Sequence, residues 1–482
     1  MNSKKQCFNP YLPSFEYVPD GEPRVFGDRL YIYGSHDAFD GDDFCVKDYV
    51  CWSAPLDCLG DWRYEGVIYK ATQDPRNKEG NMHMCAPDCV QGQDGRYYLY
   101  YQLHALSITS VAASDSPIGP FEFYGYLQHP DGTPWGEKKG DVFAFDPGVL
   151  VDGKRTFIYV GFAPTGFMKT IFKLRGNRVD ASVCLELSDD MKTVIGGEKT
   201  IVPGPELSAG TSFEEHAFFE ASSIRKMGEK YVYVYSSEKS HELCYAISRF
   251  PDRNFEYGGI LVSIGDIGFK GNDRAVNYTG NTHGGMVEIN DQWYIFYHRQ
   301  TNKQKCARQG CAEKLHIRED GSFEQAEVTS CGLNAGPLSG KGVYEARIAC
   351  NLWSKEGTFS YVKTREKDKK GKHPYYTQSG GDREENGDQY IANMKDGSVA
   401  GFKYFDIGPD TRISMKVRGD AKGRMRISNS PASKDYVEIN ISPSHDYTEM
   451  ICDKTLPFTG EQALFFTFIG KGSVDFKSFA LE

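Results

Sequence analysis

Four acidic residues and one histidine stand at nearly the same distance before five similar segments of the sequence. Each segment alternates aromatic and other apolar residues, as Tyr231-Val232-Tyr233-Val234 does, and follows a turn rich in Gly, Asp or Lys. This alternation behind a turn predicts the second strand of a β-hairpin. The polar residues, which lie 10, 9, 10, 11 and 10 positions before the segments and therefore head the first strands, are Asp20, Asp88, Asp146, Glu220 and His283.

Carboxyl groups at equivalent strand heads would meet if the hairpins surrounded one axis. Carboxylates that share a partly desolvated space raise one another's pKa, so one can stay protonated near neutral pH while another is ionised. Glycoside hydrolysis uses such a pair of carboxyl groups. Each acid taken singly is equally well explained as a turn residue or a cap. The shared spacing of all five favours a common site.

The five segments predict the fold class. They begin at Leu30, Tyr97, Thr156, Tyr231 and Trp293, at spacings of 67, 59, 75 and 62 residues. Strand-and-turn units repeated at such spacings, with no helical periodicity between them, are typical of a β-propeller. We therefore expect an all-β protein that begins with a five-bladed β-propeller.

The last third of the chain has a different pattern. A length of 482 residues favours two domains. After Gly342 short alternating runs continue without the polar strand heads, which is typical of a β-sandwich. The predicted domains are a catalytic propeller at 1–341 and a β-sandwich at 342–482.

Composition excludes several classes of partner. The 56 basic and 66 acidic residues give a net charge of −10, and no basic stripe is present, which argues against nucleic acid. No apolar run is long enough for a membrane span or a signal peptide, so we expect a cytoplasmic protein.

The odd number of cysteines, 13, predicts reduced thiols. The spacing of Cys85 and Cys89 does not match a structural zinc site.

The strand-head motifs resemble those of glycoside hydrolase family 43, whose members are five-bladed propellers that cleave arabinose- and xylose-containing glycans with inversion. The resemblance covers about residues 9–335, and residues 342–482 resemble more weakly a family 6 carbohydrate-binding module. The motifs that carry it are Pro19-Asp20-Gly21-Glu22, Ala86-Pro87-Asp88, Phe145-Asp146-Pro147, Phe219-Glu220-Ala221-Ser222 and Thr282-His283-Gly284.

The resemblance implies a role for each matching residue. Asp20 would be the general base, Glu220 the general acid, and Asp146 the group that orients the acid and tunes its pKa. Glu22 remains an alternative base, because the proline of the first motif follows Glu22 rather than Asp20. No cofactor is required for this chemistry, and the resemblance implies a structural or channel calcium, with His283 as its candidate ligand.

Further residues are candidates for contact with substrate. Each could instead be a solvated loop residue, a buried residue that supports the site, or half of a surface ion pair. Loop and aromatic residues near the strand ends could touch a sugar, and arginines late in the fifth repeat could pair with a carboxylate. The candidate substrate-binding residues are Asp88, His36, Phe39, Trp135, Arg299 and Arg308.

These observations predict an exo-acting α-L-arabinofuranosidase, with β-xylosidase activity as a second capacity. The expected partner is an arabinoxylan or xylo-oligosaccharide substrate, with no nucleic acid and no membrane. The alternatives are a primary β-xylosidase or a galactofuranosidase and, from another class, a non-catalytic carbohydrate-binding propeller. Because a binding module has no need for Asp20, Asp146 and Glu220 together, their presence favours an enzyme.

Overall fold

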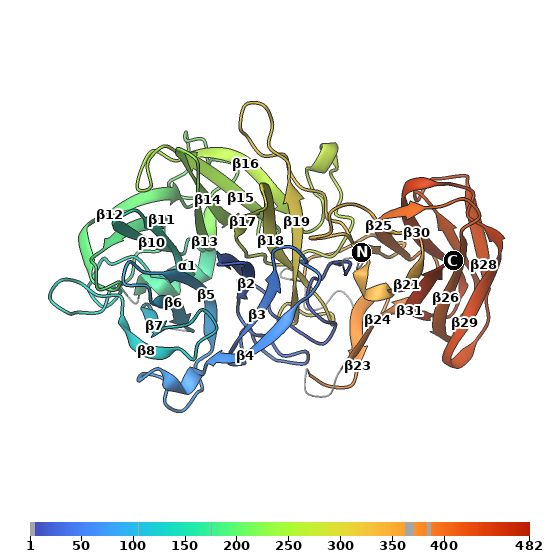
Figure 1. The fold of residues 1–482 in the computed structure, drawn as a ribbon, viewed down its shortest axis with the longest axis horizontal. Helices are drawn as coiled ribbons and strands as arrows, with labels where there is room; N and C mark the ends of the chain where they lie inside the picture. The colour runs from blue at the N-terminus through green and yellow to red at the C-terminus, as the bar shows by residue number, and fades with distance from the viewer. Residues whose placement is uncertain (1–4, 105, 175, 362–370, 383–386) are drawn as a thin grey trace.

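The fold is all-β, with five small antiparallel sheets in the first part of the chain and two larger sheets in the last part (Figure 1). The computed structural model describes residues 5–104, 106–174, 176–361, 371–382 and 387–482. The predicted five-bladed propeller followed by a β-sandwich is confirmed. Within the described residues, no helix is long and apolar enough to cross a membrane.

Each of the first four blades has four strands in sequential neighbour order, and the fifth has three among the described residues. The blades are formed by β1 (Glu22–Phe26), β2 (Arg29–Tyr33), β3 (Tyr49–Pro55) and β4 (Arg63–Tyr69); β5 (Met84–Gln91), β6 (Tyr97–Leu103), β7 (Thr109–Ser114) and β8 (Glu122–Tyr126); β9 (Gly148–Asp152), β10 (Arg155–Gly161), β11 (Ala181–Leu187) and β12 (Val194–Pro203); β13 (Phe218–Met227), β14 (Lys230–Ser237), β15 (Glu242–Ser248) and β16 (Glu256–Ser263); β17 (Met286–Ile289), β18 (Gln292–Gln300) and β19 (Arg308–Leu315).

Apolar cores lie between neighbouring blades and close the ring. Because the second strands alternate large apolar side chains on both faces, each strand packs against the blade before it and the blade after it. Leu30 and Ile32 of β2, for example, pack with Tyr294 and Phe296 of β18, which joins the first blade to the fifth. Because the ring is closed, the innermost strands of the five blades are held around one axis.

One α-helix interrupts the predicted strand-and-turn pattern. Helix α1 (Gly166–Leu174) follows β10, and its outer side exposes Phe167 and Leu174. Lys169 of this helix is buried and its Nζ lies 2.6 Å from Glu206 Oε2. The helix lies between β10 and β11 in the chain and is not one of the four strands of the third blade.

The last part of the chain folds as two facing sheets around a core rich in phenylalanine. β20 already pairs with β25, a few residues before the predicted boundary at 341–342. The strands are β20 (Leu338–Ser339), β21 (Gly342–Glu345), β22 (Asn351–Trp353), β23 (Tyr375–Ser379), β24 (Asp388–Met394), β25 (Val399–Ile407), β26 (Arg412–Gly419), β27 (Lys422–Ser428), β28 (Tyr436–Ile441), β29 (Ser444–Thr455), β30 (Gly460–Lys471) and β31 (Val474–Leu481).

The sandwich is joined to the propeller by buried polar contacts. Lys403 Nζ lies 2.9 Å from Glu327 Oε1 and 3.4 Å from Asp266 Oδ2. After β23, Asp382 lies beside the first blade, where its Oδ2 is 2.8 Å from Lys47 Nζ. This second contact reaches the loop between β2 and β3, which borders the site.

Candidate active site

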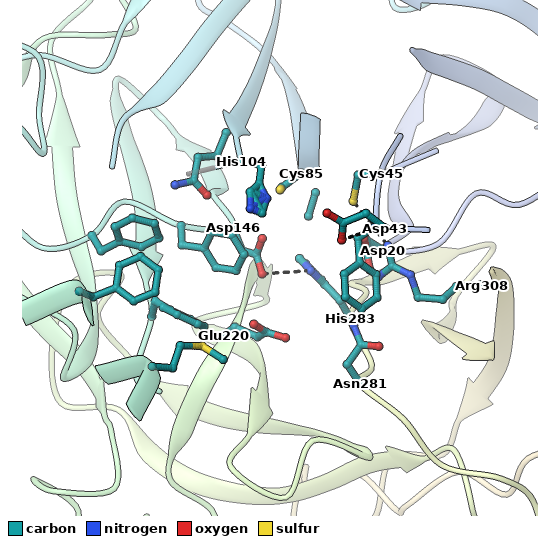
Figure 2. Close-up of a pocket in the computed structure, with 18 residues that line it drawn as sticks. Asp20, Asp43, Cys45, Cys85, His104, Asp146, Glu220, Asn281, His283 and Arg308 are labelled. Atoms are coloured by element: carbon teal, nitrogen blue, oxygen red, sulfur yellow. Dashed lines mark hydrogen bonds and ion pairs between the residues drawn. The ribbon is translucent and has the colours of Figure 1, made fainter. Parts of the chain in front are cut away.

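A cavity of about 340 Å³ opens at the propeller axis and is lined by three of the four predicted acids, Asp20, Asp146 and Glu220. His283 and Arg308 also line it. In Figure 2, Asp146 and Glu220 lie on one side, Asp20 and Arg308 lie on the other, and His283 stands between them. The structure therefore brings together residues that are up to 288 positions apart in the sequence.

The backbone at these acids departs from regular strand geometry. Asp20 and Asp146 precede β1 and β9 with φ angles of 56° and 46°, and Ala221, next to Glu220, has φ 72°. Residues other than glycine seldom adopt positive φ, and such strained positions cluster at functional sites. In β13 the register also shifts on both sides of Glu220, as in a β-bulge, which turns a side chain away from the regular alternation.

Asp20 is held as a carboxylate. Its Oδ1 lies 2.8 Å from Arg308 Nη1 and 3.2 Å from His298 Nδ1. Burial would raise the pKa of Asp20, but the charge of Arg308 and the contact with His298 hold that pKa well below its usual range. Asp20 is therefore ionised throughout the physiological pH range, which suits a general base.

Glu220 is held as a carboxylic acid. Burial, and after it the negative charge of Asp146, raises the pKa of Glu220 to about 8. Glu220 therefore carries its proton at neutral pH, as a general acid must. The two carboxyl groups stand in opposite protonation states on opposite sides of one cavity (Figure 2).

Asp146 connects the acid to the histidine. Its Oδ2 accepts a hydrogen bond from the Ala221 N–H at 3.2 Å, which ties it to the residue after Glu220. The same oxygen lies 3.4 Å from His283 Nδ1. Burial alone would lower the pKa of His283, but Asp146 raises it to about 9, so the imidazole is positively charged beside the carboxylate. Asp146 thus positions the loop of the acid and contributes negative charge next to it.

Arg308 is fixed by a second carboxylate and by an aromatic ring. Its Nε donates to Asp37 Oδ2 at 2.8 Å, and its guanidinium carbon lies 4.7 Å from the ring centroid of Phe44. The sequence did not predict this pairing of Asp37 with Arg308. Since its carboxylate is fully buried and aligned with the guanidinium fork, it locks the cation that keeps Asp20 ionised.

Glu22 does not line the cavity. Its Oε1 lies 2.9 Å from Arg225 Nη1 and accepts a hydrogen bond from Ser223 Oγ at 2.6 Å. Arg24, on the same strand, forms a two-pronged ion pair with Asp88. Glu22, Arg24, Asp88 and Arg225 form a buried cluster farther along the axis, which we call the axial ion-pair cluster. Asp20, not Glu22, therefore stands where a base can reach a substrate.

Asp88 was expected to point into the cavity and does not. Both of its carboxylate oxygens are occupied, because Arg24 pairs with them and the Val149 and Cys89 N–H groups donate to them at 2.7 Å each. The reason is the longer turn of the second blade, Gly92 to Arg96, where the first blade has only Gly27 and Asp28. Counting back from β6 by the same number of residues therefore stops at Asp88, three residues short of the cavity position at Cys85.

The strand pairing identifies the residue that takes the place expected of Asp88. Cys85 pairs with Gln102, the sixth residue counted from Tyr97, just as Glu220 pairs with Ser236, the sixth from Tyr231. Cys85, Ala86 and Gln102 line the cavity. The second blade thus contributes a thiol and an amide instead of a carboxylate.

Four other predicted substrate contacts lie outside the cavity, each with a structural partner. His36 Nε2 lies 3.1 Å from Glu16 Oε1. Phe39 packs on Tyr17 in a small core. Arg299 stacks on Tyr376 of the sandwich, 3.8 Å from the ring centroid. Trp135 is buried between the second and third blades.

Several lining residues carried no sequence motif. Gln102 lines the cavity, and its buried Oε1 has no hydrogen-bond partner among the described residues. Only the pairing of β5 with β6 could have pointed to it. The other lining residues that the sequence did not single out include Asp43, Phe44, Cys45, His104 and Asn281.

The calcium implied for the region of His283 does not fit the residues described there. Calcium prefers six to eight oxygen ligands. The nearest carboxylates are already neutralised by protein cations, Asp146 by His283 and Asp20 by Arg308.

Comparison with known proteins places the site in a family. Residues 9–323 match the model of glycosyl hydrolases family 43. A xylosidase/arabinosidase of Thermoclostridium stercorarium is 48% identical over 99% of both chains. A xylosidase/arabinosidase of Bacteroides ovatus is 31% identical over 60% of this chain and 87% of its own.

A solved structure supports the fold alone. A family 43 β-xylosidase/α-arabinofuranosidase from a compost microbial metagenome matches 67% of this chain and 98% of its own with a TM-score of 0.51 and 24% identity. The matched sequence and the paired carboxyl groups at the propeller axis lead to one conclusion: the chain belongs to glycoside hydrolase family 43.

Proposed function

We propose that this glycoside hydrolase is an inverting, exo-acting enzyme that releases α-L-arabinofuranose, and also β-D-xylose, from arabinoxylan-derived oligosaccharides. The observation that carries the proposal is the pair of carboxyl groups in opposite protonation states, Asp20 ionised and Glu220 protonated, across a cavity of about 340 Å³. A cavity of this size suits one sugar unit rather than a long chain.

In this mechanism Glu220 gives its proton to the glycosidic oxygen as the bond to the anomeric carbon breaks. Asp20 takes a proton from a water molecule on the opposite face of the sugar, and that water oxygen forms the new bond to the anomeric carbon. Asp20 ends protonated, Glu220 ends ionised, and the configuration is inverted. Loss of the proton from Asp20 to solvent and uptake of a proton by Glu220 restore the starting state.

Two relatives support the choice of sugar. Both are named xylosidase/arabinosidase, and one of them aligns along the whole chain. The same names favour a second candidate, an enzyme that acts mainly as a β-xylosidase. Both candidates use the same carboxyl groups and differ in which sugar the cavity accepts.

The experiment compares nitrophenyl α-L-arabinofuranoside, β-D-xylopyranoside and β-D-galactofuranoside as substrates of the wild type, Glu220→Gln, Asp20→Asn and Glu22→Gln. We expect arabinofuranoside turnover that falls by roughly 10²- to 10⁴-fold in the first two variants. Proton NMR of the first product anomer checks inversion. Turnover that survives Asp20→Asn, or a first product of retained configuration, would contradict the mechanism, and a preference for xylopyranoside would favour the second candidate.

We also propose that the protein is cytoplasmic and that the sandwich binds glycan. The cytoplasmic location is supported by the thirteen cysteines, which are all free thiols as a reducing compartment requires. Binding of glycan by the sandwich rests on the resemblance alone. Cell fractionation tests the first, and titration of inactive Glu220→Gln protein with xylan oligosaccharides tests the second.

A further inference from the structure

A histidine, a carboxylate and a thiol meet in the fourth blade, away from the residues that line the catalytic cavity. They are His216, in the segment between β12 and β13, and Glu242 and Cys244 on β15. Because alternate residues of a strand point to the same face, the side chains of Glu242 and Cys244 lie next to each other. One ligand atom from each of the three residues lies within 4.8 Å of the other two.

The distances between these atoms are close to those between the ligands of a tetrahedral zinc ion. Cys244 Sγ lies 3.8 Å from His216 Nδ1 and 3.6 Å from Glu242 Oε1. Ligands that stand about 2.0–2.3 Å from a tetrahedral zinc ion are roughly 3.4–3.6 Å apart. His216 Nδ1 and Glu242 Oε1 are closer, 2.6 Å apart, because they share a hydrogen bond. A metal ion would replace the shared proton and move these two atoms apart by roughly 0.8 Å.

The three types of ligand favour zinc over calcium. Imidazole nitrogen, thiolate sulfur and carboxylate oxygen all bind Zn²⁺, whereas calcium takes oxygen ligands. One thiolate and one carboxylate carry two negative charges, which neutralise a divalent cation at a place where Glu242 and Cys244 are buried. Burial, and after it the charge of Glu242, raises the pKa of Cys244 well above its usual range. Zinc binding therefore displaces the thiol proton to solvent.

We propose that His216, Glu242 and Cys244 form a zinc-binding site, with water as the fourth ligand. The His216 side chain is 16% exposed, so zinc and water can reach the site from its side. Tyr257 stacks on the imidazole, with ring centroids 4.8 Å apart, and Ser237 Oγ donates a hydrogen bond to Glu242 Oε1 at 2.6 Å. Contacts of this kind fix the orientation of metal ligands.

Zinc at this site would link a connecting segment to the blade that carries the general acid. His216 stands just before β13, and Glu220 follows four positions later on that strand. Glu242 and Cys244 are on β15, which is separated from β13 by β14 alone in the same sheet. The ion would therefore tie the start of β13 to the body of the fourth blade. This inference concerns metal binding and does not depend on the proposed function.

The test measures zinc binding by the whole chain after treatment with EDTA and dialysis. We expect one Zn²⁺ per chain in equilibrium dialysis, and a melting temperature that rises when zinc is added, because the ion binds the folded state. The affinity for zinc should fall by roughly 10²-fold or more in His216→Ala and in Cys244→Ala. Cobalt in place of zinc should give a thiolate-to-cobalt charge-transfer band in the near ultraviolet with the wild type and not with Cys244→Ala.

Cys184→Ala is the matched control, because Cys184 is a buried thiol in the same core as Cys244 and belongs to no cluster of metal ligands among the described residues. It should keep the wild-type affinity for zinc and the cobalt band. His216→Ala changes a partly exposed residue and decides the question if Cys244→Ala fails to fold. A wild type that binds no zinc, or zinc bound equally well by His216→Ala and the wild type, overturns the inference. The proposed function stands in either case, because no readout uses glycoside hydrolysis.

Discussion

The guanidinium of Arg308 reaches two buried carboxylates at once, with Nη1 2.8 Å from Asp20 Oδ1 and Nε 2.8 Å from Asp37 Oδ2. The positive charge of Arg308 thus offsets the negative charge of the base, Asp20, and that of Asp37, which holds Arg308 in place. Because removing one partner of a buried ion pair leaves an uncompensated charge, this triad governs both the stability of the site and the protonation of Asp20.

Replacing Arg308 with methionine should raise the pKa of Asp20, because burial would then act on it without the charge of Arg308, the largest of the effects that lower this pKa. The wild-type pKa lies below that of an unfolded aspartate, so the stabilising effect of ionised Asp20 is lost only as pH falls through the low folded pKa. In Arg308→Met we expect the acidic limb of kcat/KM to move to higher pH. We also expect the free energy of unfolding to fall by roughly 3–5 kcal/mol.

Arg155→Met is the control for this variant, since Arg155 pairs with Glu186 at the protein surface. Its free energy of unfolding should change by only about 0–1 kcal/mol, with no change in the pH profile. Urea unfolding and pH–rate profiles measure both effects. An unshifted acidic limb in Arg308→Met would mean that Arg308 does not set the pKa of Asp20.

Replacing Asp146 with asparagine should lower the pKa of Glu220. The charge of Asp146 helps raise that pKa to about 8, and activity requires protonated Glu220, so wild-type kcat/KM should decline as pH rises through about 8. In Asp146→Asn the alkaline limb should move to lower pH, and kcat should fall because the Ala221 contact is altered. An alkaline limb that stays in place would assign it to another group, such as His283.

Replacing Asp88 with asparagine should affect stability far more than catalysis. The carboxylate lies in the axial ion-pair cluster, so the change leaves Arg24 buried without its partner and should cost roughly 3–5 kcal/mol of unfolding free energy. KM for the arabinofuranoside should stay near the wild-type value at a temperature where the variant is folded. Asp152→Asn, which breaks a partly exposed pair with Lys226, is the control. A large rise in KM for Asp88→Asn, but not for Asp152→Asn, would show that Asp88 contacts the substrate.

Replacing Asp382 with alanine should weaken substrate binding from outside the cavity. Asp382 contacts Lys47 and the Phe39 N–H, and the loop they belong to carries Asp43, Phe44 and Cys45 into the cavity. Since such partly exposed pairs contribute about 0.2–1 kcal/mol, we expect KM to rise by at most about fivefold with kcat nearly unchanged. Asp396→Ala breaks an exposed pair with Lys355 elsewhere in the sandwich and should leave KM unchanged. Equal KM values in the two variants would show that the sandwich does not brace this loop.

The sequence predicted the propeller because its evidence is local. The second strands β2, β6, β10, β14 and β18 alternate apolar residues behind turns, and this pattern is visible without knowledge of neighbours. Asp20, Asp146 and Glu220 were located for the same reason, since two-residue turns keep their distance from these strands nearly constant. Asp88 was misplaced because one longer turn changes that count.

Contacts between distant segments could not be predicted in the same way. Arg308 was proposed as a partner for a carboxylate, but its link to Asp37 depends on how the fifth blade closes against the first. Trp135 was predicted to contact a sugar and Arg299 to pair with a carboxylate at the site, because their side chains suit these roles as well as structural ones. Only the packing of the sandwich and of the neighbouring blade shows that both are structural.

The axial ion-pair cluster lies on the propeller axis at the inner end of the cavity. A separate hollow of about 410 Å³ is lined in part by Arg24 and Arg225 of this cluster. If the enzyme acts at chain ends, as we propose, the freed monosaccharide leaves by the route through which the substrate entered. Accumulated product would then compete with the next substrate for the same cavity.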